Sequence, residues 1–182
     1  MNLVKFCSGL VLLIYPLLVF IGLQQQQMKL LLLVLAAAML LRLIVASSNK
    51  AMAPLLVATA ILGLALIAAS SITQSSTFLL FYPVMVNLCL LCVFTYSVLI
   101  NQPVITQLAK LKHPNLDAAG ERYTRKVTLI WCVFFVINGS IALLSCYLST
   151  ELWTLYNGLI SYLAIGSLLT AEFCYRKWVL KV

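Results

Sequence analysis

The stretch RYTRKVTLIWCVFFVINGS, residues 122–140, joins a basic, polar segment to a long apolar run. Three basic residues precede the run, and the pair Asn138-Gly139 lies inside it. An apolar run next to basic residues is typical of a membrane-spanning helix whose basic end faces the cytoplasm. The stretch therefore predicts one such helix, and it raises the question of why an asparagine lies within it.

The composition of the whole chain points the same way. Of its 182 residues, 64% are hydrophobic and 9% are charged, whereas soluble domains carry about 25% charged residues. Mean hydropathy is +1.09. We therefore predict one all-α membrane domain over residues 1–182. We attribute the net charge of +8 to basic residues that lie beside the membrane surface. We therefore expect no nucleic-acid partner.

Six segments are apolar enough to cross a hydrocarbon core of about 30 Å, which takes about 20 helical residues. Short polar breaks such as QQQQ and SITQSST separate most of them. The sequence therefore predicts a polytopic bundle of six transmembrane helices. The expected spans are residues 4–23, 28–46, 52–70, 78–100, 127–148 and 153–173.

The distribution of Lys and Arg indicates an orientation for this bundle. If six helices alternate in direction, all but one of the 12 Lys and Arg residues lie on the side of the termini, and Lys29 alone lies on the other. Because basic residues accumulate in cytoplasmic segments, we expect a multi-pass protein with both termini in the cytoplasm. The first apolar segment is long and lacks an A-x-A-like cleavage site, so we expect a retained helix rather than a signal peptide.

The one long connection, residues 101–126, is expected to lie in the cytoplasm. In its segment PVITQLAKLKHP, Val104, Ile105, Leu108 and Leu111 fall on one helical face. This pattern predicts a short amphipathic helix at the membrane surface between the fourth and fifth spans. Two interpretations stay open: the helix covers the bundle, or it recruits anionic lipid or a protein partner.

Basic residues of this connection are the first candidate site, for lipid headgroups or partner proteins. Each Lys or Arg near a cytoplasmic leaflet attracts anionic headgroups by about 1 kcal/mol. The alternative is that these residues only orient the chain. The candidates are Lys110, Lys112, Arg122, Arg125 and Lys126.

Polar and small side chains inside the spans form the second candidate set. Asn87 and Asn138 lie near the middle of neighbouring antiparallel spans, where an interhelical amide bond contributes about 1 kcal/mol. Gly139 lies between Cys132 and Cys146 in a seam of small residues, which allows helices to approach closely. We interpret Asn138 first as a residue that fixes helix register.

Two charged residues lie near the ends of spans. Arg42 and Glu172 are expected to extend to the membrane interface. Glu172 precedes Arg176 by four residues, the order that favours an ion pair within a helix. The alternative for Glu172 is a proton or cation site.

The sequence lacks the residue sets of common membrane enzymes. It has one histidine, His113, and no H-E-x-x-H cluster. Its six cysteines lie in apolar runs, where the thiolate is disfavoured, so we interpret them as packing residues, including the C-x-x-C of Cys89 and Cys92. We therefore expect a non-enzymatic protein without catalytic residues, metal or cofactor.

The segments PVITQLAKL, RYTRKVTLIWCVFFVINGSIALL and ELWTLYNGLISYL resemble the C-terminal half of the intracellular septation protein A family. The chain departs from that family after Trp153, where Tyr156 is followed by Asn157 and not by a lysine. The chain also resembles uncharacterised membrane proteins that accompany fatty-acid-like and aryl polyene biosynthesis genes. The similarity to the septation protein A family covers residues 101–175 and centres on Pro103, Trp131, Phe134, Phe135, Gly139 and Trp153.

This resemblance implies a bacterial inner-membrane protein of envelope maintenance or lipid-related biosynthesis. Our first hypothesis is a protein that binds lipid or proteins of these pathways at the cytoplasmic leaflet. The second is a transporter or flippase for a lipid-linked or aryl-lipid product, with Asn87, Asn138 and Glu172 along its path. The third is an acyl-handling enzyme that depends on His113 or a cysteine. The identity of lipid and partner, and the oligomeric state, stay open.

Overall fold

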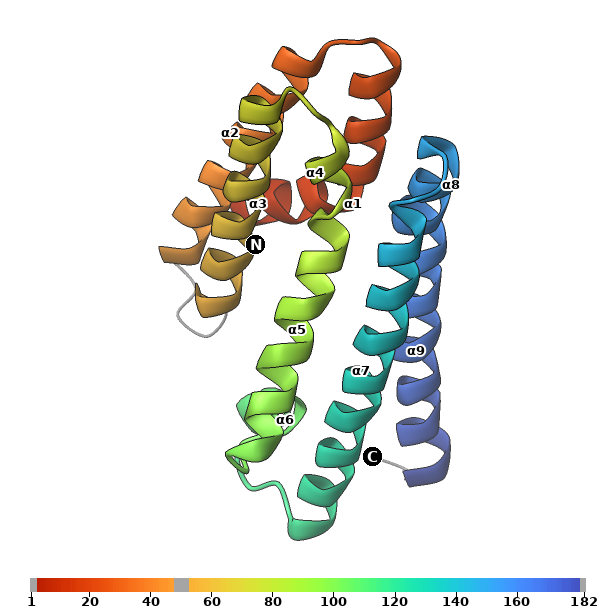
Figure 1. The fold of residues 1–182 in the computed structure, drawn as a ribbon. Helices are drawn as coiled ribbons and strands as arrows, with labels where there is room; N and C mark the ends of the chain where they lie inside the picture. Colours follow the sequence, from red (N-terminus) through yellow and green to blue (C-terminus); the bar gives the residue numbers. More distant parts are fainter. Residues whose placement is uncertain (1–2, 48–52, 181–182) are drawn as a thin grey trace.

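The part of the chain that the structure describes is helical throughout. The computed structural model describes residues 3–47 and 53–180, and no strand occurs among them. Figure 1 shows the helices joined by short turns. The predicted all-α fold is confirmed. In chain order the helices are α1 (Leu3–Gln24), α2 (Met28–Ser47), α3 (Ala53–Thr73), α4 (Thr77–Leu80), α5 (Tyr82–Leu99), α6 (Val104–Lys112), α7 (Ala118–Ser145), α8 (Thr150–Leu155), the π-helix η1 (Tyr156–Ile160), α9 (Ser161–Tyr175) and a second π-helix, η2 (Arg176–Leu180).

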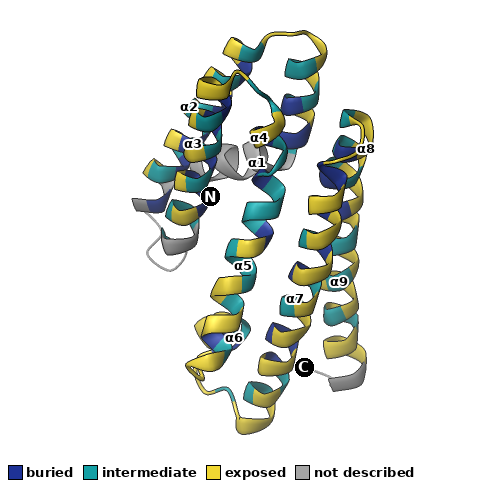
Figure 2. Cartoon of the chain, viewed as in Figure 1, coloured by how far each residue is buried: buried dark blue, intermediate teal, exposed yellow. Residues whose placement is uncertain are grey.

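The helices form two neighbouring groups. α5 and α7 run side by side, with α9 along α7, while α2 pairs with α3 beside the start of α5 (Figure 1). Exposed residues lie along most of the helices (Figure 2). Many of them are large and hydrophobic, among them Leu33, Ile72 and Leu144. An apolar surface of this extent is unfavourable in water, whereas lipid solvates it. The fold is therefore that expected of a helical membrane protein.

Among the described residues, four helices are long and apolar enough to cross a membrane. The first predicted span contributes a shorter apolar stretch, Ile14–Gln24. The number of six spans therefore stays a prediction. The predicted second loop, which contains Lys50, lies outside the described residues. The four candidate spans are Leu56–Thr73, Thr77–Leu99, Ala118–Ser145 and Thr150–Trp178.

The helix that contains most of the fifth predicted span, residues 127–148, is shifted toward the N-terminus. This helix, α7, begins nine residues earlier, at Ala118, and ends at Ser145. Asp117 caps the start, because its Oδ1 accepts a hydrogen bond from the backbone N–H of Gly120 at 2.8 Å. The apolar pattern starts only after the capped turns, so hydropathy placed the helix start too late. The basic residues before the apolar run consequently lie on a helix and not in a loop.

The fourth predicted span consists of two helices, α4 and α5, because a proline interrupts it. Pro83 lies in the first turn of α5 and has no N–H to donate to the Leu79 carbonyl. In a membrane such a carbonyl needs another donor. The Tyr15 hydroxyl donates to the Leu79 carbonyl at 3.0 Å, and the Trp153 indole N–H donates to the Leu80 carbonyl at 3.0 Å. Side chains from α1 and α8 therefore satisfy the backbone at the break.

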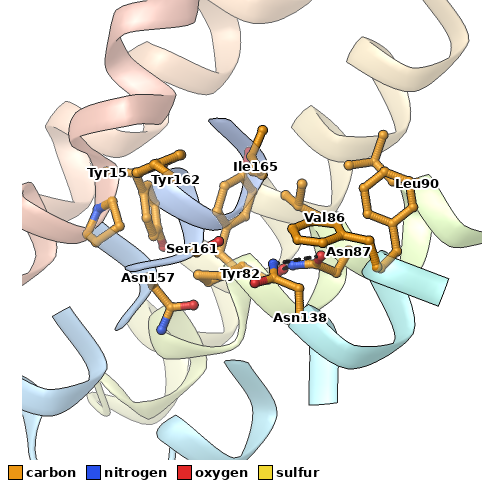
Figure 3. A pocket seen from close by; sticks show the side chains of 14 residues that line it. Tyr15, Tyr82, Val86, Asn87, Leu90, Asn138, Asn157, Ser161, Tyr162 and Ile165 are labelled. Atoms are coloured by element: carbon orange, nitrogen blue, oxygen red, sulfur yellow. Dashed lines mark hydrogen bonds between the residues drawn. The ribbon is translucent and has the colours of Figure 1, made fainter. Parts of the chain in front are cut away.

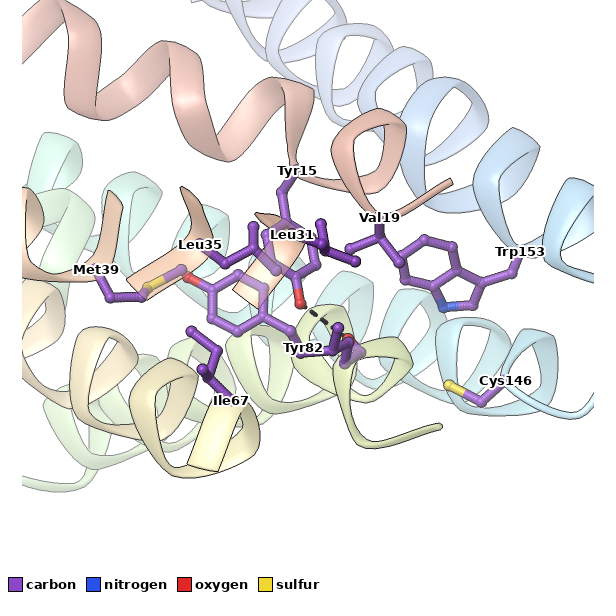
Figure 4. Packing of buried hydrophobic residues seen from close by; sticks show 10 residues of the cluster. Tyr15, Val19, Leu31, Leu35, Met39, Ile67, Tyr82, Cys146 and Trp153 are labelled. Atoms are coloured by element: carbon purple, nitrogen blue, oxygen red, sulfur yellow. Dashed lines mark hydrogen bonds between the residues drawn. The ribbon is translucent and has the colours of Figure 1, made fainter. Parts of the chain in front are cut away.

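The hydrophobic core surrounds this break (Figure 4). Val19 of α1, Leu35 of α2 and Trp153 of α8 are completely buried in it. Cys146, at the end of α7, also donates its thiol to the Leu80 carbonyl, at 3.2 Å. The core therefore joins the first two helices to the start of the last candidate span, and the hydrogen bonds at the break lie inside it.

Replacing Trp153 by Phe should destabilise the protein by about 1–2 kcal/mol, because it removes a donor from a buried carbonyl while keeping an aromatic ring. For a chain of this size the loss corresponds to a fall in apparent Tm of about 5 °C. Thermal unfolding in a mild detergent measures this value. The matched control is Trp178→Phe, since Trp178 is 74% exposed. Equal Tm shifts in both variants would contradict the assigned role of the indole N–H.

Candidate functional site

A cavity of about 220 Å³ lies between α1, α5, α7 and the segment where η1 passes into α9 (Figure 3). Its wall is mostly apolar and aromatic, with a few amide and hydroxyl groups, as is common in sites for small organic ligands. The polar side chains in the wall include Asn87, Asn138, Asn157 and Ser161, and the aromatic ones Tyr15, Tyr82, Phe134, Phe135 and Tyr162.

A chain of hydrogen bonds crosses the cavity wall and connects three helices. Asn138 of α7 donates from Nδ2 to Oδ1 of Asn87 on α5 at 3.0 Å (Figure 3). Tyr156 of η1 donates to Oδ1 of Asn138 at 2.8 Å, and Asn87 donates to the Pro83 carbonyl at 2.9 Å. The structure thus brings together the two asparagines that the sequence placed at similar depth.

Small residues allow α5 and α7 to approach closely at this point. A Cβ atom added to Gly139 would lie 3.1 Å from the Cβ of Asn87, so a larger residue would push the two helices apart. About two turns further along α5, the hydroxyl of Thr95 donates to the sulfur of Cys132 at 3.7 Å. Cys146 contacts the carbonyl at the end of α4. All three positions of the predicted seam therefore face α4 and α5.

The π-helix η1 supplies the third side of the site. Its wider turn adds one residue relative to an α-helix, and such turns occur frequently at functional sites. Asn157 of η1 donates to Oγ of Ser145 at 3.0 Å and to the Trp153 carbonyl at 2.9 Å. Tyr156 and Asn157 were missed as site residues because a π turn leaves no periodic signal. The spacing of Asn157 and Ser161, four residues apart, could have placed them on one face.

Arg42 does not extend to the membrane interface as predicted. Its side chain is 6% exposed, and its Nη1 donates to the Tyr82 hydroxyl at 3.4 Å. Tyr82 lines the cavity and packs against Tyr15, with ring centroids 4.5 Å apart. The prediction failed because it treated α2 alone, whereas the packing of α2 near the start of α5 encloses the guanidinium group.

Glu172 and Arg176 lie apart from the cavity, toward the C-terminal end of α9. Arg176 Nε is 3.5 Å from Glu172 Oε1, and Tyr123 of α7 donates to the same oxygen at 3.2 Å. The rings of Tyr123 and Tyr175 stack with centroids 6.0 Å apart. This cluster connects α7 to α9. Glu172 is therefore not in a common path with the two asparagines.

A short helix, α6, occupies the segment for which a surface helix is predicted, and polar side chains of α6 contact α7. The hydroxyl groups of Thr106 and Thr124 are 2.7 Å apart and buried, and Lys110 pairs with Glu121. Leu111, on the apolar face, is exposed. Leu108 is exposed as well, whereas Val104 and Ile105 are half-buried, and both the amphipathic character of α6 and its contact with lipid stay predictions.

The basic candidate residues divide into two groups. Lys110 is paired with an acid of α7, and Arg125 donates from Nη1 to Asn101 Oδ1 at 2.9 Å. Arg122 and Lys126 are exposed on α7. The side chain of Lys112 is outside the described part of the chain. The structure thus gives two of the five candidates partners within the protein, and the headgroup site stays a prediction.

No protein-family model, curated protein or solved structure matches this chain. The resemblance to septation proteins therefore stays a prediction. Within residues 3–47 and 53–180, His, Cys, Asp and Glu side chains form no cluster of three that could hold a metal ion.

A double-mutant cycle tests the amide pair. Asn87→Leu and Asn138→Leu should show a coupling free energy of about 1 kcal/mol, because the two side chains bond directly. The Asn138 variant should be the less stable, since it leaves Oδ1 of Asn87 and the hydroxyl of Tyr156 without their hydrogen-bond partner. Equilibrium unfolding in mixed detergent micelles measures these values.

The control cycle pairs Asn87→Leu with Asn157→Leu, since Asn157 bonds to Ser145 and Trp153 instead. These two substitutions should be additive to within about 0.5 kcal/mol. Additivity in the Asn87–Asn138 cycle as well would contradict the hydrogen bond between them.

Proposed function

We propose that this chain is a non-enzymatic membrane protein that binds an apolar, lipid-like molecule in the cavity between α1, α5, α7 and α9. The observation that carries the proposal is the wall of the cavity, which combines aromatic rings with amide groups that already bond to one another. Such a wall favours an apolar guest, because most of it is apolar and both amides of the asparagine pair already have hydrogen-bond partners.

The size of the cavity limits what it can hold. At about 220 Å³ it is below the range of about 300–1,000 Å³ typical of sites for drug-sized ligands. It therefore suits one acyl or aryl segment of a lipid, with the remainder of the molecule outside. We infer that the cavity holds such a segment while the rest lies in the bilayer.

The cellular setting that we propose is the bacterial inner membrane, with six spans in a single domain and both termini in the cytoplasm. The asymmetry of the 12 Lys and Arg residues supports this orientation. Arg122 and Lys126, exposed near the start of α7, would then face anionic headgroups, or a partner protein of envelope or lipid biosynthesis, at the cytoplasmic leaflet.

A transporter or flippase for a lipid-linked or aryl-lipid product is the second candidate. Asn87 and Asn138 line the cavity, as this hypothesis requires. The position of Glu172 beside Tyr123 and Arg176 does not favour it, because the predicted path included that carboxylate. Binding without transport needs only the cavity, so we rank the binding protein before the transporter.

Filling the cavity should abolish binding of an apolar probe. Leu90→Trp introduces an indole into the wall, whereas Leu88→Trp adds the same ring at an exposed position of α5. Excluding two or three methylenes, at about 0.8 kcal/mol each, should weaken binding of pyrene-labelled dodecanol by about tenfold or more. Fluorescence titration of the full chain in nanodiscs measures the affinity. Equal affinity in the two variants, each folded, would rule out the cavity as the binding site.

The orientation predicts which turns are accessible from each side of the membrane. In a chain without native cysteines, Gln26→Cys should react with a membrane-impermeant maleimide in intact spheroplasts, because Gln26 lies between the first two predicted spans. His113→Cys should react only after permeabilisation. Protection of the cysteine at position 26 under the first condition would contradict six spans.

A further inference from the structure

The buried guanidinium group of Arg42 carries a charge that the acidic side chains of this chain do not neutralise. The sequence has four acidic residues, and the structure places each of them in another interaction. Asp117 caps α7 and Glu121 pairs with Lys110. Glu151 accepts a hydrogen bond from Gln24, and Glu172 pairs with Arg176. An ionised arginine inside a membrane protein is costly and normally has a partner.

Arg42 and Tyr82 also have more hydrogen-bond donors than acceptors. The guanidinium group has five N–H donors and no acceptor. One of them reaches the Tyr82 hydroxyl oxygen at 3.4 Å, and the buried Nε has no partner among the described residues. Since the Tyr82 oxygen accepts that bond, its own O–H hydrogen is available as a donor. Among the described residues, the Nε group of Arg42 and the hydroxyl hydrogen of Tyr82 therefore lack an oxygen acceptor.

One of these two residues, Tyr82, borders the cavity, whereas Arg42 is not among the lining residues. Tyr82 contributes to the cavity wall, together with Tyr15 and Pro83 from the same neighbourhood (Figure 3). Arg42 lies at the hydroxyl end of the Tyr82 ring, on the side of α2. An oxygen that accepts the Tyr82 hydrogen thus comes close to the guanidinium group. Arginine is the side chain best suited to bind carboxylate and phosphate groups, because its planar N–H groups match their two oxygens.

We propose that Arg42 and Tyr82 bind the anionic group, a carboxylate or a phosphate, of an amphiphile whose apolar segment occupies the cavity. This assignment rests on the proposed function, since it requires an apolar guest. The anion neutralises the buried charge and accepts hydrogens from Tyr82 O–H and from the guanidinium group. The Asn87–Asn138 pair, bonded internally, forms a neutral part of the wall. The ligand is therefore an anionic lipid-like molecule and not a neutral one.

A matched pair of probes tests the charge requirement. Pyrene-labelled dodecanoate and pyrene-labelled dodecanol share the ring and the chain and differ in the terminal group. The full chain in nanodiscs of zwitterionic lipid should bind the carboxylate about tenfold more tightly than the alcohol, as expected for one charge-assisted interaction. Arg42→Gln should remove this preference by lowering the affinity for the carboxylate. Arg176→Gln, which alters an arginine at the end of α9, should keep the preference.

Two further measurements keep the test decisive if Arg42→Gln does not fold. Tyr82→Phe removes only the hydroxyl and should reduce the preference, and the comparison of the two probes on the unaltered protein needs no variant. Equal binding of carboxylate and alcohol by the unaltered protein would overturn the anion site while leaving the proposed cavity function intact. Binding of neither probe by folded protein would overturn both proposals.

Competition identifies the source of the anion. Dodecyl phosphate should displace pyrene-labelled dodecanoate, because it combines the anionic group with a chain. Inorganic phosphate at the same concentration should leave the probe bound. Displacement by inorganic phosphate alone would assign the Arg42 site to a free anion and would overturn the amphiphile.

Discussion

The missing N–H of Pro83 is the constraint on which much of this structure depends. It separates α4 from α5 and removes the helical donor of the Leu79 carbonyl, which together with the Leu80 carbonyl lies at the end of α4. Within a membrane these carbonyls must be satisfied by protein groups, and Tyr15 and Trp153 supply the donors. Both residues are far from α4 in sequence, so the break fixes α1 and α8 against the middle of the chain. The hydrophobic core forms at this point.

The cavity lies next to the same break, since Tyr82 and Pro83 line it. Asn87 donates to the carbonyl of Pro83 itself and accepts from Asn138, so the asparagine pair extends the hydrogen bonding from the proline into α7. Tyr156 extends the hydrogen bonding from Asn138 into η1. The wider π turn of η1 changes which side of the following helix, α9, is directed toward α7. Gly139 makes the close approach possible. The helices are thus held by polar bonds on one side of the cavity, and apolar side chains fill the remaining wall incompletely.

The features predictable from sequence were those that depend on composition and on depth in the membrane. Hydropathy identified apolar helices, and similar depth in antiparallel helices indicated the pairing of Asn87 with Asn138. Hydropathy could not show the start of α7, which Asp117 determines through a capping bond, or the π turn of η1. The burial of Arg42 depends on the packing of α2 near α5, and no pattern within a single span contains that information.

The polarity of the site follows from which donors have partners. At the asparagine pair, each amide bonds to another group of the protein, so this part of the wall gains little from a polar ligand. At Arg42 and Tyr82 the donors exceed the acceptors, in low-dielectric surroundings that strengthen any charge-assisted bond. The ligand that we propose, with one polar end, would therefore bind in one orientation, with that end toward α2 and its apolar part toward α7. The basic residues of α6 and α7 lack this selectivity, because they are exposed or paired with residues of the chain.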